Sequence, residues 1–251
     1  MKIQQIRNAT MKIVYGGVTF LLDPWLQDKG TGMTAPAVRP EMCGIKSPLN
    51  ALPASPEEIL SGVDYCLVTH VHPDHFTKDY LPNSMKILVQ NTADCEKVKA
   101  SGFENVTVVD DASKINGVVT IRKTPAVHGD NEQIAAIMGE VSGYLLAGAE
   151  KSLYIAGDTV FYSGVAETLS KFTPDVIVLN CCEATVPEGR LIMNLQDIES
   201  VCRVCPKATV IATHLDSVNH ALLTSDDVRQ FVLNNHLNQV IVPHSGEWIE
   251  E

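Results

Sequence analysis

Short runs of β-branched and other apolar residues recur along the whole chain, and turn-forming residues bound each run. Val, Ile, Tyr and Phe dominate these runs, which are four or five residues long, as in β-strands. They cover residues 11–15, 18–22, 65–68, 86–89, 106–109, 118–121, 143–146, 153–156, 176–179, 209–212 and 239–242. So many strands exclude a purely helical fold.

Helical periodicity appears between some of these runs. The helix-like segments are residues 56–60, 92–101, 164–172, 195–204 and 225–234, with Thr92 and Ser225 as expected N-caps. Near the N-terminus, Gly16 and Gly17 separate two strands and can supply the positive φ of a hairpin turn. The pattern predicts an α/β protein with hairpins early and strand–helix alternation late.

The stretch from Asp23 to Pro56 has no periodicity and contains six prolines. Loops of this length inside a domain are usually functional, and this one follows a strand end where it could cover a site. No repeat, low-complexity tract or second linker interrupts the chain, so we expect one domain over residues 1–251.

An apolar strand runs directly into a cluster of imidazole and carboxylate groups: His70, His72, Asp74 and His75. A strand end followed by a tight turn can aim His70 and His72 at one cation, and Asp74 and His75 at a second. Such ligands suit zinc, manganese or iron. Four of them within six residues are hard to explain as ordinary loop polarity, so the sequence predicts a metal site.

The motif His-x-His-x-Asp-His after an apolar strand resembles the signature of the metallo-β-lactamase superfamily. Three later landmarks match in order: His128 in a loop, Asp158 in a Gly-Asp-Thr turn, and His214 at a strand end. The resemblance covers nearly the whole chain. It implies the αββα sandwich, in which two β-sheets pack face to face with helices outside.

By this resemblance the chain would hold two divalent metal ions, with zinc expected and manganese or iron left open. One ion would be bound by His70, His72 and His128, the other by Asp74, His75 and His214, and Asp158 would bridge them. A hydroxide shared by the ions would attack the substrate. Asp74 would also act in catalysis, by orienting the hydroxide or relaying a proton to the leaving group.

Other polar residues permit two readings each. Asp23 could accept a hydrogen bond from a ligand histidine or simply end a strand. Asn219 and His220 could reach the pocket mouth, and we expect His220 to be the second catalytic residue. His244 also ends a strand and is the rival of His214 as last ligand, whereas His236 is expected at the surface.

Within the superfamily, the early run 20–25 is most similar to ascorbate-6-phosphate lactonase-like proteins, although Asn8 stands where members of that branch often have a histidine. In the long loop, Arg39, Lys46 and Asn50 are candidates to bind an anionic substrate group, with a solvated loop as the alternative. The seven cysteines are expected to be reduced and mostly buried, including Cys181 and Cys182 at a strand end.

The net charge of −11, without a basic stripe, argues against nucleic acid as a partner. No apolar stretch reaches the roughly 18 residues of a membrane span, so we expect a cytoplasmic protein that binds a small-molecule substrate, with a homo-oligomer left open. The expected activity is hydrolysis of a lactone, ester or phosphodiester in a small polar metabolite. A metal-dependent nuclease and a metal-containing binding protein with little turnover remain alternatives.

Overall fold

Side chains of the central strands alternate between two apolar layers in the computed structural model, which describes residues 1–148 and 150–251. On β11 (Val176–Asn180), Val176 and Val178 pack between the two sheets, whereas Ile177 and Leu179 pack beneath helices. Successive strand residues point to opposite faces, so a strand that is apolar on both faces must be covered on both. This requirement produces a four-layered molecule.

The first sheet contains seven strands. Their order is β16 (Trp248–Glu250), β1 (Lys2–Arg7), β2 (Thr10–Tyr15), β3 (Val18–Leu22), β4 (Tyr65–Leu67), β5 (Lys86–Val89) and β6 (Asn105–Val108). Neighbours from β16 to β3 are antiparallel, and those from β3 to β6 are parallel. The predicted hairpin turn at Gly16 and Gly17 is confirmed, with positive φ at both residues.

The second sheet also contains seven strands. Their order is β15 (Val240–Ile241), β14 (Thr209–Thr213), β11, β10 (Leu153–Ile155), β9 (Ser142–Ala147), β8 (Val119–Pro125) and β7 (Ser113–Ile115). From β15 to β10 the strands are parallel. A separate two-stranded ribbon is formed by β12 (Thr185–Val186) and β13 (Gly189–Arg190).

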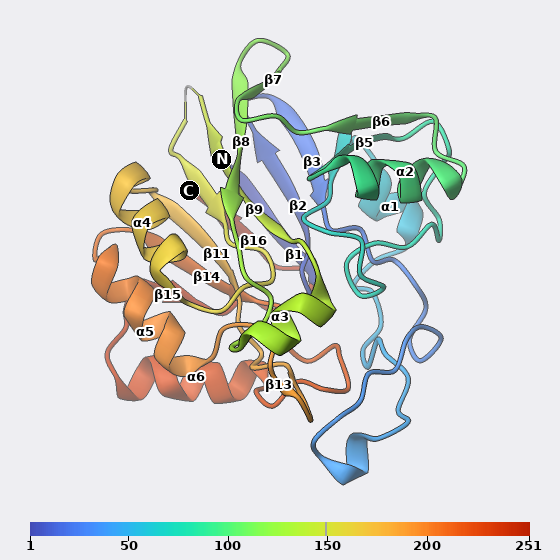
Figure 1. Cartoon of the computed structure of the whole chain (residues 1–251). Helices are drawn as coiled ribbons and strands as arrows, with labels where there is room; N and C mark the ends of the chain where they lie inside the picture. The colour runs from blue at the N-terminus through green and yellow to red at the C-terminus, as the bar shows by residue number, and fades with distance from the viewer. Residues whose placement is uncertain (149) are drawn as a thin grey trace.

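Helices cover the outer face of each sheet (Figure 1). Residues of α1 (Pro56–Leu60) and α2 (Thr92–Ala100) share an apolar cluster with the first sheet. The second sheet is covered by α4 (Ser163–Phe172), α5 (Leu195–Val204) and α6 (Ser225–Asn234), with α3 (Glu132–Met138) beside it. The predicted αββα sandwich is confirmed.

Two predicted helix caps are wrong by one residue. The N-caps are Asn91 and Thr224, whose side chains accept hydrogen bonds from the backbone N–H three residues on, so Thr92 and Ser225 are already the first helical residues. Either polar neighbour can cap a helix, and the backbone selects the one in extended conformation.

The long loop after β3 contains one 3₁₀ turn, Pro40–Met42, and projects from the sandwich (Figure 1). The buried guanidinium of Arg7 donates hydrogen bonds to the carbonyls of Trp25 and Gln27, and its Cζ lies 5.1 Å from the Trp25 ring centroid. The loop is therefore anchored to β1 at its start. Over the described residues, every helix is too short or too polar to cross a membrane.

Candidate metal centre

Five strand ends meet at one edge of the sandwich and deliver the polar residues of the sequence motifs. Asp23 follows β3, His70 follows β4, His128 follows β8, Asp158 follows β10 and His214 follows β14. Because β3 and β4 are parallel, and so are β10, β11 and β14, the carboxyl ends within each sheet lie side by side. Topology thus gathers residues that lie far apart in the sequence.

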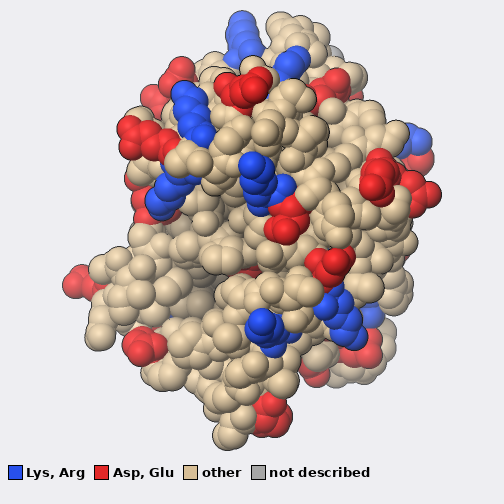
Figure 2. All heavy atoms as spheres, turned by 90° about the vertical axis from the view of Figure 1, so that its right-hand side faces the viewer, with Lys and Arg blue, Asp and Glu red and all other residues tan. Residues whose placement is uncertain are grey.

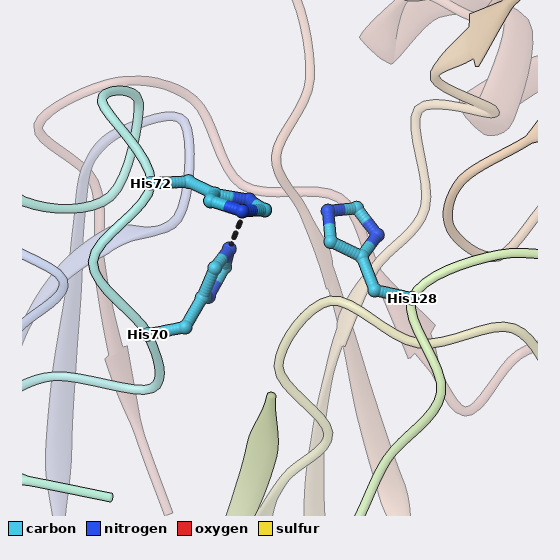
Figure 3. Close-up of side chains that lie close together, drawn as sticks. All are labelled: His70, His72 and His128. Atoms are coloured by element: carbon cyan, nitrogen blue, oxygen red, sulfur yellow. Dashed lines mark hydrogen bonds between the residues drawn. The ribbon is translucent and has the colours of Figure 1, made fainter. Parts of the chain in front are cut away.

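Ligand atoms within this edge form three overlapping groups, in each of which the atoms lie within 4.8 Å of one another. The groups are His70, His72 and His128; His70, His75 and Asp158; and Asp74, His75 and His214. Figure 3 shows the rings of His70, His72 and His128 turned toward one another. All seven residues expected as metal ligands are therefore brought together, and Asp158 lies between the two outer groups.

The spacing of these atoms fits a transition-metal ion. Ligands about 2.0–2.1 Å from a tetrahedral ion lie about 3.3–3.4 Å from each other. The Nε2 of His214 lies 3.3 Å from a carboxylate oxygen of Asp74, and the Nε2 of His128 lies 3.4 Å from an oxygen of Asp158. The Nε2 of His75 lies 3.2 Å from the same Asp158 oxygen.

Hydrogen bonds on the outer nitrogens fix which ring atom faces the centre. The Nδ1 of His75 lies 2.8 Å from Oδ2 of Asp23, and the Nδ1 of His128 lies 3.0 Å from the carbonyl of Leu191. Each Nδ1–H donates a hydrogen bond away from the centre, so the lone pair of Nε2 faces the centre and can ligate a metal. Asp23 was expected either to accept a hydrogen bond from a ligand histidine or simply to end a strand, and this contact supports the first interpretation.

Charge points to the same conclusion. Asp23, Asp74 and Asp158 are buried, and in the described part of the chain their ion pairs are formed with histidines and with no lysine or arginine. Burial alone would raise the pKa of the Asp158 carboxyl, but facing His75 and His214 keep it well below its usual range. Although burial opposes the shift, Asp158 raises the pKa values of His75 and His214, so in the metal-free protein these two rings carry the compensating charge, and divalent ions bound there would supply it in their place.

Two of the histidines stay neutral at neutral pH. Burial lowers the pKa of His128 to about 4, although the Asp158 carboxylate opposes this shift. Burial, together with neighbouring His75 and His72, also holds the pKa of His70 well below its usual range. Neutral imidazole is the form that ligates a metal. Donor chemistry, spacing and charge together show that these residues fit a metal centre.

Two residues at the site have positive φ angles, at points where a ligand side chain turns toward the centre. Gly157 has φ +67°, and a Cβ added there would lie 2.8 Å from the carbonyl oxygen of Ser142, so glycine is required before Asp158. His214 itself has φ +64°, a left-handed conformation that is uncommon for a residue with a side chain. Strain of this kind concentrates at functional sites.

Three supporting residues were not assigned this role from sequence. The amide of Asn180 donates a 2.6 Å hydrogen bond to Asp158, Thr69 donates through both its backbone N–H and its hydroxyl to Asp23, and the sulphur of Cys182 lies 3.5 Å from Nδ1 of His214. Only their position in the sequence could have indicated this role, because each residue lies at or just beyond the carboxyl end of a central strand.

His220 is buried beside the centre, and the structure gives its Nδ1 no hydrogen-bond partner among the described residues. Burial lowers the pKa of His220, while the charges of Asp74 and His214 also act on it. Asn219, in contrast, has a structural role, because its side chain forms hydrogen bonds with the backbone N–H and carbonyl of Ala35 in the long loop.

The remaining candidates lie elsewhere. Arg39 donates to the carbonyl of Ala221, and Asn50 accepts from the hydroxyl of Ser217. Lys46 is exposed. The two other histidines, His244 and His236, are exposed and belong to none of the metal-ligand groups, so the structure favours His214 over His244 as last ligand.

A cavity of about 160 Å³ opens beside His70 and His72 and extends to α2 and to residues 138–140. Its lining includes Lys97, whose ammonium lies 3.7 Å from Asp94, and the carboxylate of Glu140. Two carboxylates against one ammonium make the lining acidic. Figure 2 shows acidic and basic side chains interspersed on the face in view, without a basic stripe.

Comparisons with known proteins agree with this geometry. A family model described as a beta-lactamase superfamily domain matches residues 19–215. The UPF0173 protein YddR of Bacillus subtilis is 39% identical over 254 residues, which cover 98% of each chain. The crystal structure of isothiocyanate hydrolase from Delia radicum gut bacteria is 33% identical with a TM-score of 0.93, covering 100% of this chain and 99% of that one. A possible metal-dependent hydrolase from Veillonella parvula is 35% identical, with a TM-score of 0.91 and coverage of 99% and 98%.

Proposed function

Because this chain belongs to the beta-lactamase superfamily and to the UPF0173 family of metal-dependent hydrolases, we propose that it hydrolyses a small neutral electrophile at a centre of two divalent ions. The observation that carries the proposal is the pair of ligand groups sharing Asp158 at one sheet edge. The chain is an enzyme, and the substrate class and the two ions are proposed.

One ion would be held by His70, His72 and His128, and the other by Asp74, His75 and His214, with Asp158 between them. We expect zinc, since imidazole and carboxylate ligands at these spacings suit it, and manganese or iron would accept the same set. Divalent ions held there would lower the pKa of a coordinated water and polarise the substrate.

Two side chains are proposed to act on the reacting atoms. The carboxylate of Asp74 stays ionised, since His75 and His214 lower its pKa against the effect of burial, and it accepts a hydrogen bond that orients the attacking water. His220 is buried in the site, and its Nδ1 has no hydrogen-bond partner among residues 1–148 and 150–251, so its imidazole is available to form a hydrogen bond with the leaving atom. No serine or cysteine nucleophile is required.

The part of the cavity lining away from the ions favours an uncharged substrate group. A negatively charged group reaching it would face Asp94 and Glu140, with Lys97, which Asp94 partly neutralises, as the opposing cation. Lactones, esters and isothiocyanates all present a neutral electrophilic carbon, and the isothiocyanate hydrolase that this chain resembles acts on one of them.

The test is hydrolysis of a panel by the zinc-loaded protein. The panel contains simple lactones, carboxylic esters, benzyl isothiocyanate and an aryl phosphodiester, and each is assayed with wild type, His72→Ala and the surface control His236→Ala. We expect turnover of at least one neutral substrate by wild type and the control, with loss in His72→Ala. A fully loaded wild type that hydrolyses only the phosphodiester, or nothing, overturns the proposal.

A further inference from the structure

The outer nitrogens of three ligand histidines have acceptors of different strength. His75 faces a carboxylate at 2.8 Å and His128 a backbone carbonyl at 3.0 Å, but His214 faces the sulphur of Cys182 at 3.5 Å. Resting on the proposed function, we infer that Cys182 is the positioning residue of His214, and that metal binding by the group of Asp74, His75 and His214 depends on this thiol.

Burial makes the sulphur the natural partner of the ring. Cys182 and His214 are 0% and 1% exposed, so water does not compete for the contact. A buried ring N–H without an acceptor is destabilising, because its desolvation is not compensated. When Nε2 of His214 ligates an ion, Nδ1 carries the hydrogen and donates it to the sulphur 3.5 Å away.

The backbone of His214 has an anchor separate from that of its ring. Its φ is +64°, and its N–H donates a hydrogen bond to the carbonyl of Asn8. The contact to Cys182 comes from β11, the neighbouring strand, through the segment after Asn180. The ring is thus fixed from a second strand end.

Cys181 supplies a matched comparison within the same segment. It is as buried as Cys182, but its sulphur lies 3.7 Å from the carbonyl of Thr213, and within the described residues it forms no hydrogen bond with a ligand histidine. A substitution at either position creates a similar loss of packing. Only the loss at Cys182 removes the partner of His214.

A thiol sulphur is a weak acceptor, so it orients the ring without adding a fourth buried carboxylate. Partners of ligand histidines typically contribute 10–100-fold to metal affinity. We therefore expect Cys182→Ala to weaken binding of one of the two ions by roughly 10–100-fold. Cys182→Ser retains a hydroxyl acceptor and should restore part of that loss.

The experiment titrates Zn²⁺ into metal-free wild type, Cys182→Ala, Cys182→Ser and Cys181→Ala against a chromophoric chelator, with circular dichroism as the check of folding. The expected order of affinity for the weaker ion is wild type and Cys181→Ala highest, Cys182→Ser intermediate, and Cys182→Ala lowest. Equal affinities in all four, or equal losses in both alanine variants, overturn the inference.

Cobalt(II) loading gives a second readout. If Cys182 acts through His214, wild type shows no sulphur-to-cobalt charge-transfer band, while the visible ligand-field spectrum changes in Cys182→Ala and is kept in Cys181→Ala. A charge-transfer band that disappears in Cys182→Ala would make the thiol a ligand itself and contradict the positioning role. A wild type that binds no ion defeats the proposed function, whereas two ions bound equally by all variants defeat this inference alone.

Discussion

Replacing Asp23 with asparagine tests whether the group behind a ligand histidine tunes metal binding. Oδ1 of Asp23 accepts from the backbone N–H of Thr69 at 2.7 Å, and Oδ2 accepts from both the Thr69 hydroxyl at 2.7 Å and Nδ1 of His75 at 2.8 Å. Asparagine keeps the size and one oxygen. Its amide nitrogen takes the place of Oδ2 and cannot accept from His75.

The magnitude follows from which contacts survive. The Thr69 hydroxyl can rotate and accept from the new amide, and the remaining oxygen can still accept from the backbone N–H, so two of the three contacts persist in altered form. The charge-assisted bond to His75 is lost. Loss of such a partner lowers metal affinity about 10–100-fold, or about 1.4–2.7 kcal/mol of binding free energy.

The assay is a competition titration of Zn²⁺ against a chelator, with elemental analysis of the dialysed protein. Asp28→Asn is the control, because Asp28 belongs to the same long loop but accepts its hydrogen bonds from exposed Tyr80. Wild-type affinity in Asp23→Asn, with the fold intact by circular dichroism, would refute the reasoning that the carboxylate supports His75 as a ligand.

Three further predictions concern catalysis, backbone and pH. His220→Gln should lower kcat about 10²-fold or more at unchanged metal content, with His236→Gln as control; equal kcat removes His220 from the reaction. Gly157→Ala should lower the free energy of unfolding by at least about 1 kcal/mol, through its positive φ and the clash with Ser142, as read from denaturant midpoints; a wild-type midpoint contradicts the clash. The metal-free protein should lose stability as pH falls from about 6.5 to about 4, because over this window His128 takes up a proton in the unfolded chain and not in the folded one; a stability independent of pH there would contradict its lowered pKa.

The candidate site could be located from sequence because its residues follow apolar strands. His70 comes after β4 and His214 after β14, and parallel neighbours align their carboxyl ends, so local strand patterns already indicate one shared edge. What the sequence could not give is the pairing of side chains across that edge. The contacts of Cys182 with His214 and of Asn180 with Asp158 depend on the register of β11 against β14 and on the parallel pairing of β10 with β11.

Secondary structure was predictable where apolar residues are continuous and less so where partners are distant. The run 2–7 mixes glutamine and lysine with isoleucine, and it forms β1 between β2, which follows it in sequence, and β16 at the other end of the chain, where Ile3 pairs opposite Ile249. No local pattern contains that information. The helix α3 is short and opens at Asn131, whose side chain accepts from the N–H of Ile134, a cap that the surrounding polar loop obscures.

The roles of the long-loop residues also required the structure. Arg39 and Asn50 have the chemistry to bind an anion, but the hydrogen bonds that the structure gives them are internal, to Ala221 and Ser217. A charged or amide side chain in a loop looks the same in sequence whether it binds a substrate or anchors its own backbone. Burial and hydrogen-bond partners distinguish the two.

The most direct test of the account is the metal content of the purified protein, measured by elemental analysis after reconstitution with Zn²⁺ and removal of excess ion. Wild type and the surface control His236→Ala should each retain about two ions per chain. His72→Ala and His214→Ala should each retain fewer, because they remove ligands from different groups. A wild type that retains none, or variants that retain as much as wild type, would contradict the central claim that these strand ends form a dinuclear metal centre.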